Sequence, residues 1–141
     1  IAFALACNTK VLLLDEPTNG LDIPSKIRFR KLIASVFTDD KLIFISTHQI
    51  RDLDNLIDRV IIVDNGELLL NASVGDISEK ICFKTVSELT RPDEILYSEE
   101  SLKGFSIVTK NINAEDSKVN LEHLFNAITE KPILAKAIFQ N

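Results

Sequence analysis

Two adjacent carboxylates follow a short apolar run near the start of the chain. Asp15 and Glu16 come directly after Val-Leu-Leu-Leu at positions 11–14. An acidic side chain at the end of a buried strand can hold a hydrated Mg²⁺ ion, and a neighbouring carboxylate can accept a proton from an attacking water molecule. Asp15 is therefore a candidate metal holder and Glu16 a candidate general base. Taken alone, such a pair is also typical of an ordinary solvated loop.

A second apolar run ends in a polar cluster of its own. Leu-Ile-Phe-Ile at positions 42–45 is followed by Ser46, Thr47 and His48. A histidine can donate a hydrogen bond to a terminal phosphate without carrying a fixed positive charge. A single histidine is more often structural or merely exposed. Ligands of α/β proteins, however, bind at the carboxyl ends of strands, so we expect His48 to act beside the Asp-Glu pair.

The elements that would position these groups alternate between apolar runs and helical patterns. The runs at 11–14, 42–45 and 60–63 are continuous, as expected of parallel strands covered on both faces. Asp22 can cap a helix that joins the first two runs, and a second helical pattern spans 49–58. This order predicts an α/β fold with a mostly parallel sheet. Asn65-Gly66 then predicts a tight hairpin that adds an antiparallel edge.

The character of the sequence changes near residue 80. A capped helical turn is expected at 73–80, where Ser73 and Asp76 have the spacing of a capping box. It precedes three short strand candidates, at 80–86, 94–100 and 104–111, and an amphipathic helix at about 119–130. The last eleven residues could form a second short helix or be frayed. We therefore expect two domains, one at 1–79 and a small α+β appendage at 80–141.

Composition excludes some classes of function. The 141 residues carry a formal net charge of -5, so nothing favours a nucleic-acid partner, which usually requires clustered Lys and Arg. No apolar run approaches the roughly 20 residues needed to span a bilayer. The chain contains no Met, so we expect it to be processed or to be a piece of something longer.

Four motifs in order, the first two of them within one stretch, carry a resemblance to a known family. The stretches VLLLDEPTNGLD, LIFISTHQ and DRVIIVDNGE resemble the second half of the ATP-binding subunit or domain of ABC transporters, over roughly residues 1–70. The resemblance implies a partial P-loop NTPase-type sheet with flanking helices, and ATP and Mg²⁺ as cofactors. Asp15, in a Walker B strand, would hold Mg²⁺ through water, and Glu16 would polarise the hydrolytic water. His48 would contact the γ-phosphate, and Asp22, in a D-loop, would reach across a dimer to the opposite site.

The rest of that family's pattern is absent from these 141 residues. A phosphate-binding P-loop needs two glycines five positions apart followed by Lys and Ser or Thr. The four glycines, at positions 20, 66, 75 and 104, cannot supply it, and there is no Gly-Gly pair for the family's signature loop. We expect the phosphate loop to precede Ile1 and the chain alone to hydrolyse no ATP.

Residues 80–141 resemble the C-terminal extension of the ATPases of ABC-2-type exporters. The resemblance implies a fragment of an ATP-hydrolysing subunit that couples ATP binding and hydrolysis to membrane export. Its partners would be an integral membrane permease and a second ATP-binding subunit, in a homo- or heterodimer, with no nucleic acid. It would be cytoplasmic, peripheral on the inner face of the cell membrane. Two alternatives stay open: a soluble non-transport ABC-family ATPase, and a non-catalytic dimerising or regulatory module.

Overall fold

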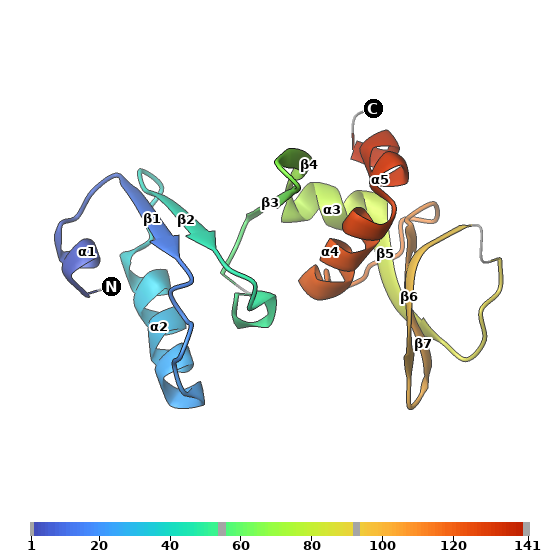
Figure 1. Ribbon diagram of the computed structural model, residues 1–141, viewed down its shortest axis with the longest axis horizontal. Coiled ribbons are helices and arrows are strands. Elements are labelled where there is room, and N and C mark those ends of the chain that lie inside the picture. The colour runs from blue at the N-terminus through green and yellow to red at the C-terminus, as the bar shows by residue number, and fades with distance from the viewer. Residues whose placement is uncertain (1, 54–55, 92–93, 140–141) are drawn as a thin grey trace. The chain divides into compact units, whose positions relative to one another are not determined.

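The computed structural model describes residues 2–53, 56–91 and 94–139, and it contains both helices and strands along the whole of that length (Figure 1). The chain divides into two compact units, Ile1–Leu56 and Ile57–Asn141. The first holds α1 (Ala2–Ala6), β1 (Val11–Asp15), α2 (Ile23–Val36), β2 (Leu42–Ser46) and the 3₁₀ turn η1 (Ile50–Asp52). The second holds β3 (Arg59–Asp64), β4 (Glu67–Ser73), α3 (Val74–Lys80), β5 (Ile81–Val86), β6 (Ile95–Ser101), β7 (Gly104–Lys110), α4 (Leu121–Glu130) and α5 (Pro132–Phe139). The mixed α/β class predicted from the sequence is confirmed.

Strands β1 and β2 form a parallel pair in the first unit. Their register runs from Val11 opposite Leu42 to Asp15 opposite Ser46, so both strands end at the same edge. The helix that joins them, α2, begins where the sequence predicted. The Asp22 side chain accepts a hydrogen bond of 2.9 Å from the Ser25 N–H, and a proline lies in the first turn. This N-cap fixes where the chain turns from the strand end into the helix.

Helices cover one face of this parallel pair. Phe29 and Ile33 of α2 and Leu14 of β1 are buried. One small cavity is lined by residues of α1, β1, α2 and β2 together, which places both helices on that face. The side chains on the opposite face are 43% to 71% exposed; they are Val11, Leu13, Leu42 and Phe44. We expected both faces of these strands to be buried, but in the described residues only one face is covered.

The third apolar run does not join the parallel pair in the described residues. It forms β3, which pairs antiparallel with β4 in the second unit. Asn65 (φ 48°) and Gly66 (φ 78°) make the turn between them, so the predicted hairpin is confirmed. A two-residue turn closes this pairing at little entropic cost. The larger P-loop-type parallel sheet stays a prediction. The domain boundary expected near residue 80, which would lie between α3 and β5, also stays a prediction.

The helical pattern predicted at 49–58 is much shorter in the structure. Only the three residues of η1 are helical before Leu53, and the Leu56 N–H donates to the Leu53 carbonyl at 2.9 Å. Residues 54 and 55 of that pattern lie outside the described residues. The apolar spacing that suggested a full helix therefore corresponds to a tight turn where the structure describes it.

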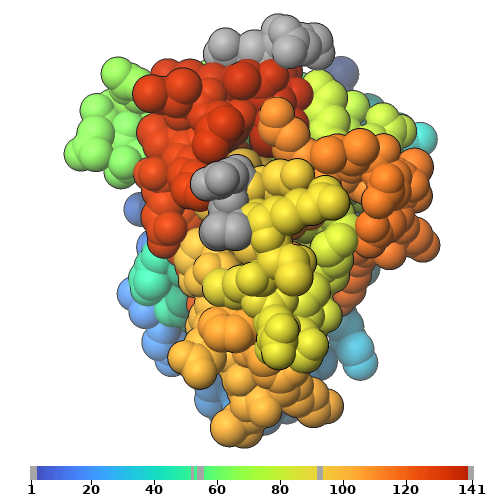
Figure 2. All heavy atoms as spheres, turned by 90° about the vertical axis from the view of Figure 1, so that its right-hand side faces the viewer, coloured from blue at the N-terminus to red at the C-terminus, as the bar shows by residue number. Residues whose placement is uncertain are grey.

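The second unit contains a three-stranded antiparallel sheet in the order β5-β7-β6, which confirms the three strand candidates. Helix α3 begins with the predicted capping box of Ser73 and Asp76. Asn120 caps α4, and the open question about the C-terminal tail is answered by α5. Figure 2 shows this unit with the red C-terminal helices beside the yellow and orange strands. Its core comprises, among others, Ile77, Ile81, Val108, Leu124 and Ile128.

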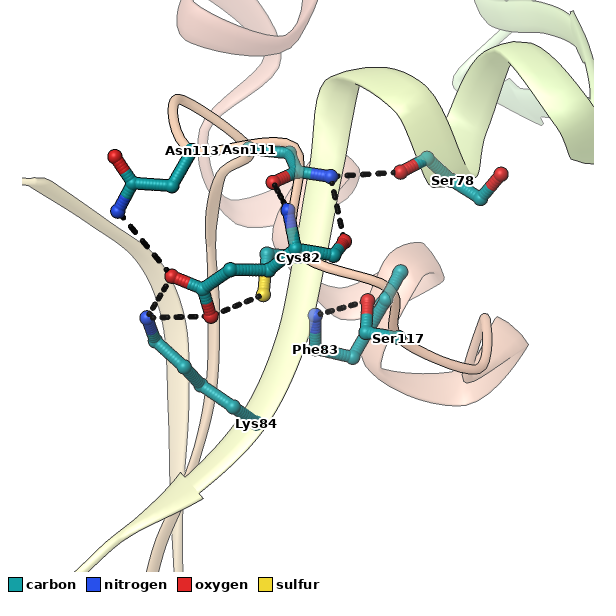
Figure 3. A network of polar contacts seen from close by, with 8 residues as sticks. Ser78, Cys82, Phe83, Lys84, Asn111, Asn113 and Ser117 are labelled. Atoms are coloured by element: carbon teal, nitrogen blue, oxygen red, sulfur yellow. Dashed lines mark hydrogen bonds and ion pairs between the residues drawn. The ribbon is translucent and has the colours of Figure 1, made fainter.

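A loop after β7 is fastened to the rest of the second unit by a polar network (Figure 3). The Asn111 side-chain amide donates to the carbonyls of Ser78 (3.0 Å) and Glu115 (2.9 Å), and its oxygen accepts from the Glu115 N–H (2.8 Å). The Ser117 hydroxyl accepts from the Phe83 N–H at 3.0 Å. Since β5 pairs with β7 on one side, Ser117 satisfies a backbone group on the other side of this edge strand.

Candidate functional site

The parallel pairing brings the predicted polar groups to one edge of the first unit. The ladder continues one residue past β1, because the Glu16 N–H donates to the Ser46 carbonyl at 2.8 Å. The Ser46 hydroxyl donates to the Asp15 carboxylate. Asp15, Glu16 and His48 therefore lie together at the carboxyl ends of β1 and β2, which is the edge where α/β proteins bind ligands.

Glu16 turns its side chain from the end of β1 toward the residues that follow β2. Its φ of 42° lies in the left-handed region, which is uncommon outside glycine and worth attention near a candidate site. Oε1 accepts a hydrogen bond from the His48 N–H at 2.9 Å and lies 2.6 Å from His48 Nδ1. Oε2 accepts from the Thr47 hydroxyl at 2.9 Å. Both carboxylate oxygens thus have donors from one dipeptide.

These contacts favour the ionised form of the Glu16 carboxyl. The hydrogen bond from the His48 ring is the largest cause of a pKa below the ordinary glutamate value, with a smaller contribution from Thr47, while partial desolvation opposes both. Glu16 is therefore ionised at neutral pH and able to accept a proton. Because a carboxylate accepts hydrogen bonds, Nδ1 of His48 carries the proton in their contact. The His48 side chain is 72% exposed, so a ligand can reach the ring.

Asp15 suits a metal ion that keeps most of its water. Its exposed carboxylate and the Ser46 hydroxyl offer oxygen ligands, and Mg²⁺ in proteins is often held by one or two carboxylates with several waters retained. Among residues 2–53, 56–91 and 94–139, no group of three or more His, Cys, Asp or Glu could hold a metal ion. The donor set fits a hydrated Mg²⁺ at Asp15 and does not fit an all-protein metal cage.

Asp22 lies apart from this cluster in its contacts. Within the part of the chain that the structure describes, no hydrogen bond or ion pair joins it to Glu16 or His48. Its carboxylate caps α2 instead, and the hydrogen bonds with Ser25 hold the Asp22 pKa below its ordinary value. Within the single chain, Asp22 sets the start of the helix.

The sequence pattern gave no individual role to three residues that contact the candidate base or its neighbours. Ser46 and Thr47 each donate to one of the carboxylates. Gln49 donates its N–H to the Thr47 hydroxyl at 3.0 Å and accepts a hydrogen bond of 2.6 Å from Lys26 of α2. The polar run that begins at Ser46 was the signal, but which side chain turns toward which carboxylate depends on the strand register and on the backbone at Glu16.

The second histidine has a packing role in the second unit. His123 Nε2 lies 3.1 Å from Glu99 Oε2, and its ring lies 5.7 Å from the Tyr97 ring between centroids. These contacts join α4 to β6.

No helix among the described residues combines the length and the apolar character needed to cross a membrane.

Comparison with known proteins agrees with the motifs at this edge. No protein-family model matches the chain. It is 36% identical over 106 residues to the methionine import ATP-binding protein MetN of Carboxydothermus hydrogenoformans, covering 68% of this chain and 31% of that protein. It is 33% identical over 96 residues to the ABC transporter ATP-binding protein NatA of Bacillus subtilis, covering 64% and 39%. The energy-coupling factor transporter ATP-binding protein EcfA2 of Lactococcus lactis is 29% identical over 103 residues, covering 73% and 36%.

The chain thus spans between 31% and 39% of the length of these three relatives. All three carry the name of a transporter or import ATP-binding protein, and their matches cover 64% to 73% of this chain. The chain is therefore a member of the family of ABC transporter ATP-binding proteins, over the part of that family's length that it covers.

Proposed function

We propose that this chain supplies the water-activating edge of an ABC-type ATPase. The observation that carries the proposal is the 2.6 Å contact between Glu16 and His48 at the ends of two parallel strands. An ionised carboxylate beside an exposed imidazole offers a proton acceptor and a hydrogen-bond donor within reach of one ligand. Family membership makes the terminal phosphate of ATP the ligand to test.

Each residue at this edge has a distinct part in the proposal. Glu16 accepts a proton from the attacking water. His48, whose Nδ1–H donates to Glu16 in this structure, turns its ring away and donates that hydrogen bond to the terminal phosphate instead. Asp15 holds Mg²⁺ through water. Mg²⁺, when bound, neutralises charge on the phosphates, which is a large part of catalysis in phosphoryl transfer.

We further propose that polypeptide outside these 141 residues supplies the phosphate-binding loop. The sequence contains no Gly-x-x-x-x-Gly-Lys-Ser/Thr pattern, and positioning by that loop and its lysine is central to the reaction. The chain alone should then release no phosphate from ATP and Mg²⁺ above background. Steady release by the isolated chain that is lost in Glu16→Gln and retained in Glu115→Gln would contradict this. Glu115 is a suitable control because it is another carboxylate with several donors, in the second unit.

For the whole protein we propose coupling of ATP hydrolysis to transport across a membrane. The relatives are named as transporter or import ATP-binding proteins. Export as the direction rests on the resemblance of residues 80–141 to the extension of ABC-2-type exporters. The partners in this proposal are a membrane permease and a second ATP-binding subunit, whose opposite site Asp22 would reach, and the location is the inner face of the membrane with no nucleic acid bound. Purification of the native assembly without any integral membrane protein would favour the soluble ABC-family alternative.

A dimerising module is a second candidate because of one observation. The uncovered face of the β1–β2 pair presents four large apolar side chains, and such patches on soluble proteins often mark interaction sites. Light scattering on the purified chain tests it. Self-association that is weakened by Leu13→Ser would support it, and a strictly monomeric, well-folded species would contradict it.

A further inference from the structure

We propose that Thr47 is a positioning residue for Glu16, and that its hydroxyl keeps the carboxylate in place when the His48 ring turns to a ligand. The inference rests on the proposed function for its catalytic meaning, because it concerns the same carboxylate. Whether Thr47 orients the Glu16 carboxylate can be measured without nucleotide.

The hydrogen bonds of Glu16 divide unequally between its two neighbours. Oε1 has both contacts with His48, one to the backbone N–H at 2.9 Å and one to Nδ1 at 2.6 Å. Oε2 has the contact with the Thr47 hydroxyl at 2.9 Å. In the described part of the chain, that hydroxyl is the donor to Oε2. It therefore fixes the rotation of the carboxylate plane, which a donor to Oε1 alone leaves free.

The direction of the Thr47 hydroxyl is itself determined. Its oxygen accepts the Gln49 N–H at 3.0 Å, so its own proton is free to point to Glu16. Gln49 is held in turn, because its side-chain oxygen accepts from Lys26 of α2 at 2.6 Å. Threonine is also restricted at χ1 by its branched β-carbon. The donor to Oε2 is thus oriented before any ligand arrives.

The consequence concerns movement of the His48 ring. If the ring rotates toward a phosphate, its Nδ1 contact with Glu16 is lost, whereas the His48 backbone N–H stays in place. The Thr47 hydroxyl also stays, because it belongs to a different side chain. Glu16 then keeps one donor on each oxygen, so the plane of its carboxylate stays fixed. Without Thr47, the same rotation would leave Oε2 with no donor from the described residues.

The test is carbon-detected NMR of the Glu16 carboxylate in the 141-residue chain at neutral pH, with the resonance identified by its loss in Glu16→Gln. The variants are His48→Ala, Thr47→Val, their combination, and Thr47→Ser in the His48→Ala background. Thr38→Val is the matched control. Thr38 donates its hydroxyl to Asp40 at 2.6 Å, so this change should move the Asp40 resonance and leave that of Glu16 unchanged.

We expect Thr47→Val to shift the Glu16 resonance in the His48→Ala background toward the value of an unbonded glutamate. Thr47→Ser keeps the hydroxyl, so in the His48→Ala background the Glu16 resonance should have the same chemical shift as in His48→Ala alone. The inference would be overturned if the Glu16 resonance did not move when Thr47→Val is added to His48→Ala. It would also be overturned if adding Thr47→Ser moved the resonance equally far. Amide spectra verify that each variant is folded, and Thr47→Ala serves as a second variant without the hydroxyl should the Val variant unfold.

A kinetic measurement separates this inference from the proposed function. In an assembly that hydrolyses ATP, Thr47→Val should lower kcat about tenfold or more, as for the loss of a hydrogen bond to a charged group, with KM for ATP unchanged. Thr47→Ser should restore kcat. If the assembly with the native residues hydrolyses no ATP, the proposed function fails, and the NMR comparison still decides whether Thr47 orients Glu16. An unchanged kcat in Thr47→Val would overturn the inference while leaving the ATPase intact.

Discussion

Glu16 in the first unit and Glu115 in the second each accept hydrogen bonds from three donor groups, but the two carboxylates have different roles. Glu16 receives all its donors from Thr47 and His48, at 2.6 to 2.9 Å. Glu115 receives its donors from Asn113 of its own loop and from Cys82 and Lys84 of β5, at 3.3 to 3.6 Å. In both cases the contacts lower the pKa of the carboxyl, with the His48 ring the largest cause at Glu16 and Asn113 at Glu115.

The difference lies in what the donors connect. The donors of Glu16 follow a parallel strand and hold the carboxylate at an exposed edge beside an imidazole. The donors of Glu115 come from its own loop and from β5, so that carboxylate anchors the loop to the strand. A well-bonded carboxylate with a lowered pKa is therefore no sign of a reactive site by itself. Its place at the ends of parallel strands, next to His48, makes Glu16 the candidate.

The change expected to have the largest effect breaks the second region and should leave the first intact. Gly104 has a φ of +115°, and a Cβ there would lie 2.2 Å from the Val86 carbonyl oxygen. Gly104→Ala must therefore displace backbone, and we expect it to lower the free energy of unfolding of the second unit by about 3 kcal/mol or more. Fluorescence of Tyr97, the single tyrosine in a chain without tryptophan, reports unfolding of this unit.

Gly66→Ala is the control for that change. Gly66 also has a positive φ, +78°, but nothing lies within 4 Å of the position that a Cβ would take. Only the backbone conformation opposes the substitution, so the expected loss is about 1–2 kcal/mol. Equal losses for the two variants would show that the close approach of Gly104 to β5 is not a determinant of stability.

A smaller effect is expected from removing the anchor of the loop. Asn111→Ala deletes three hydrogen bonds and leaves the backbone groups of Ser78 and Glu115 without this partner. We expect urea unfolding of the second unit to show a loss of about 1–3 kcal/mol. Asn113→Ala removes one exposed contact of 3.3 Å and should cost less than 1 kcal/mol. The comparison fails if Asn113→Ala is as damaging as Asn111→Ala.

Acid should weaken both regions through the two carboxylates. A carboxyl whose pKa is lower in the folded state than in the unfolded chain adds stability above its ordinary pKa. That stability is lost as the pH falls through the lowered value. Glu16→Gln should flatten the acid dependence of hydrogen exchange in the first unit, and Glu115→Gln should flatten that of Tyr97 fluorescence in the second. An effect of Glu115→Gln confined to the first unit would contradict this division.

The smallest expected effect concerns a buried hydroxyl beside the candidate site. Thr18 is 1% exposed, and its Oγ1 has no hydrogen-bond partner within the described residues. Thr18→Val keeps the shape of the side chain and removes the unpaired hydroxyl. In thermal unfolding we therefore expect the free energy of unfolding to be unchanged or to rise by up to about 1 kcal/mol. Thr18→Ser keeps the hydroxyl and loses a methyl group, and it should be destabilising. A marked loss in Thr18→Val would reveal a partner for the hydroxyl, such as an ordered water.

Much of the local structure could be predicted because its signals are local. The Asp22 cap, the Asn65-Gly66 turn and the Ser73 capping box depend on residues a few positions apart, and all three are confirmed. The strands of the second unit were also identified from their apolar runs and turn residues. Local hydrogen bonds and backbone preferences are sufficient to specify such features.

Features that depend on distant residues could be predicted only in part. The common edge of β1 and β2 follows from parallel pairing, so the meeting of Glu16 with His48 could be anticipated. The Thr47 contact could not, since it depends on the left-handed backbone at Glu16, which no sequence pattern indicated. For the apolar run that forms β3, the hairpin with β4 was predicted from the adjacent Asn65-Gly66 turn, whereas its expected place in a parallel sheet depends on distant strands and stays a prediction.

The most direct test of the central claim is phosphate release from ATP and Mg²⁺ by this chain together with polypeptide that supplies a phosphate-binding loop, in one gene product or added separately. Glu16→Gln removes the proton acceptor and keeps the side chain's size. We predict that the Glu16→Gln variant still binds ATP but releases phosphate at least about 100-fold more slowly, while Glu115→Gln leaves the rate of phosphate release unchanged. A rate in Glu16→Gln equal to that with the native residue would contradict the assignment of Glu16 as the water-activating base.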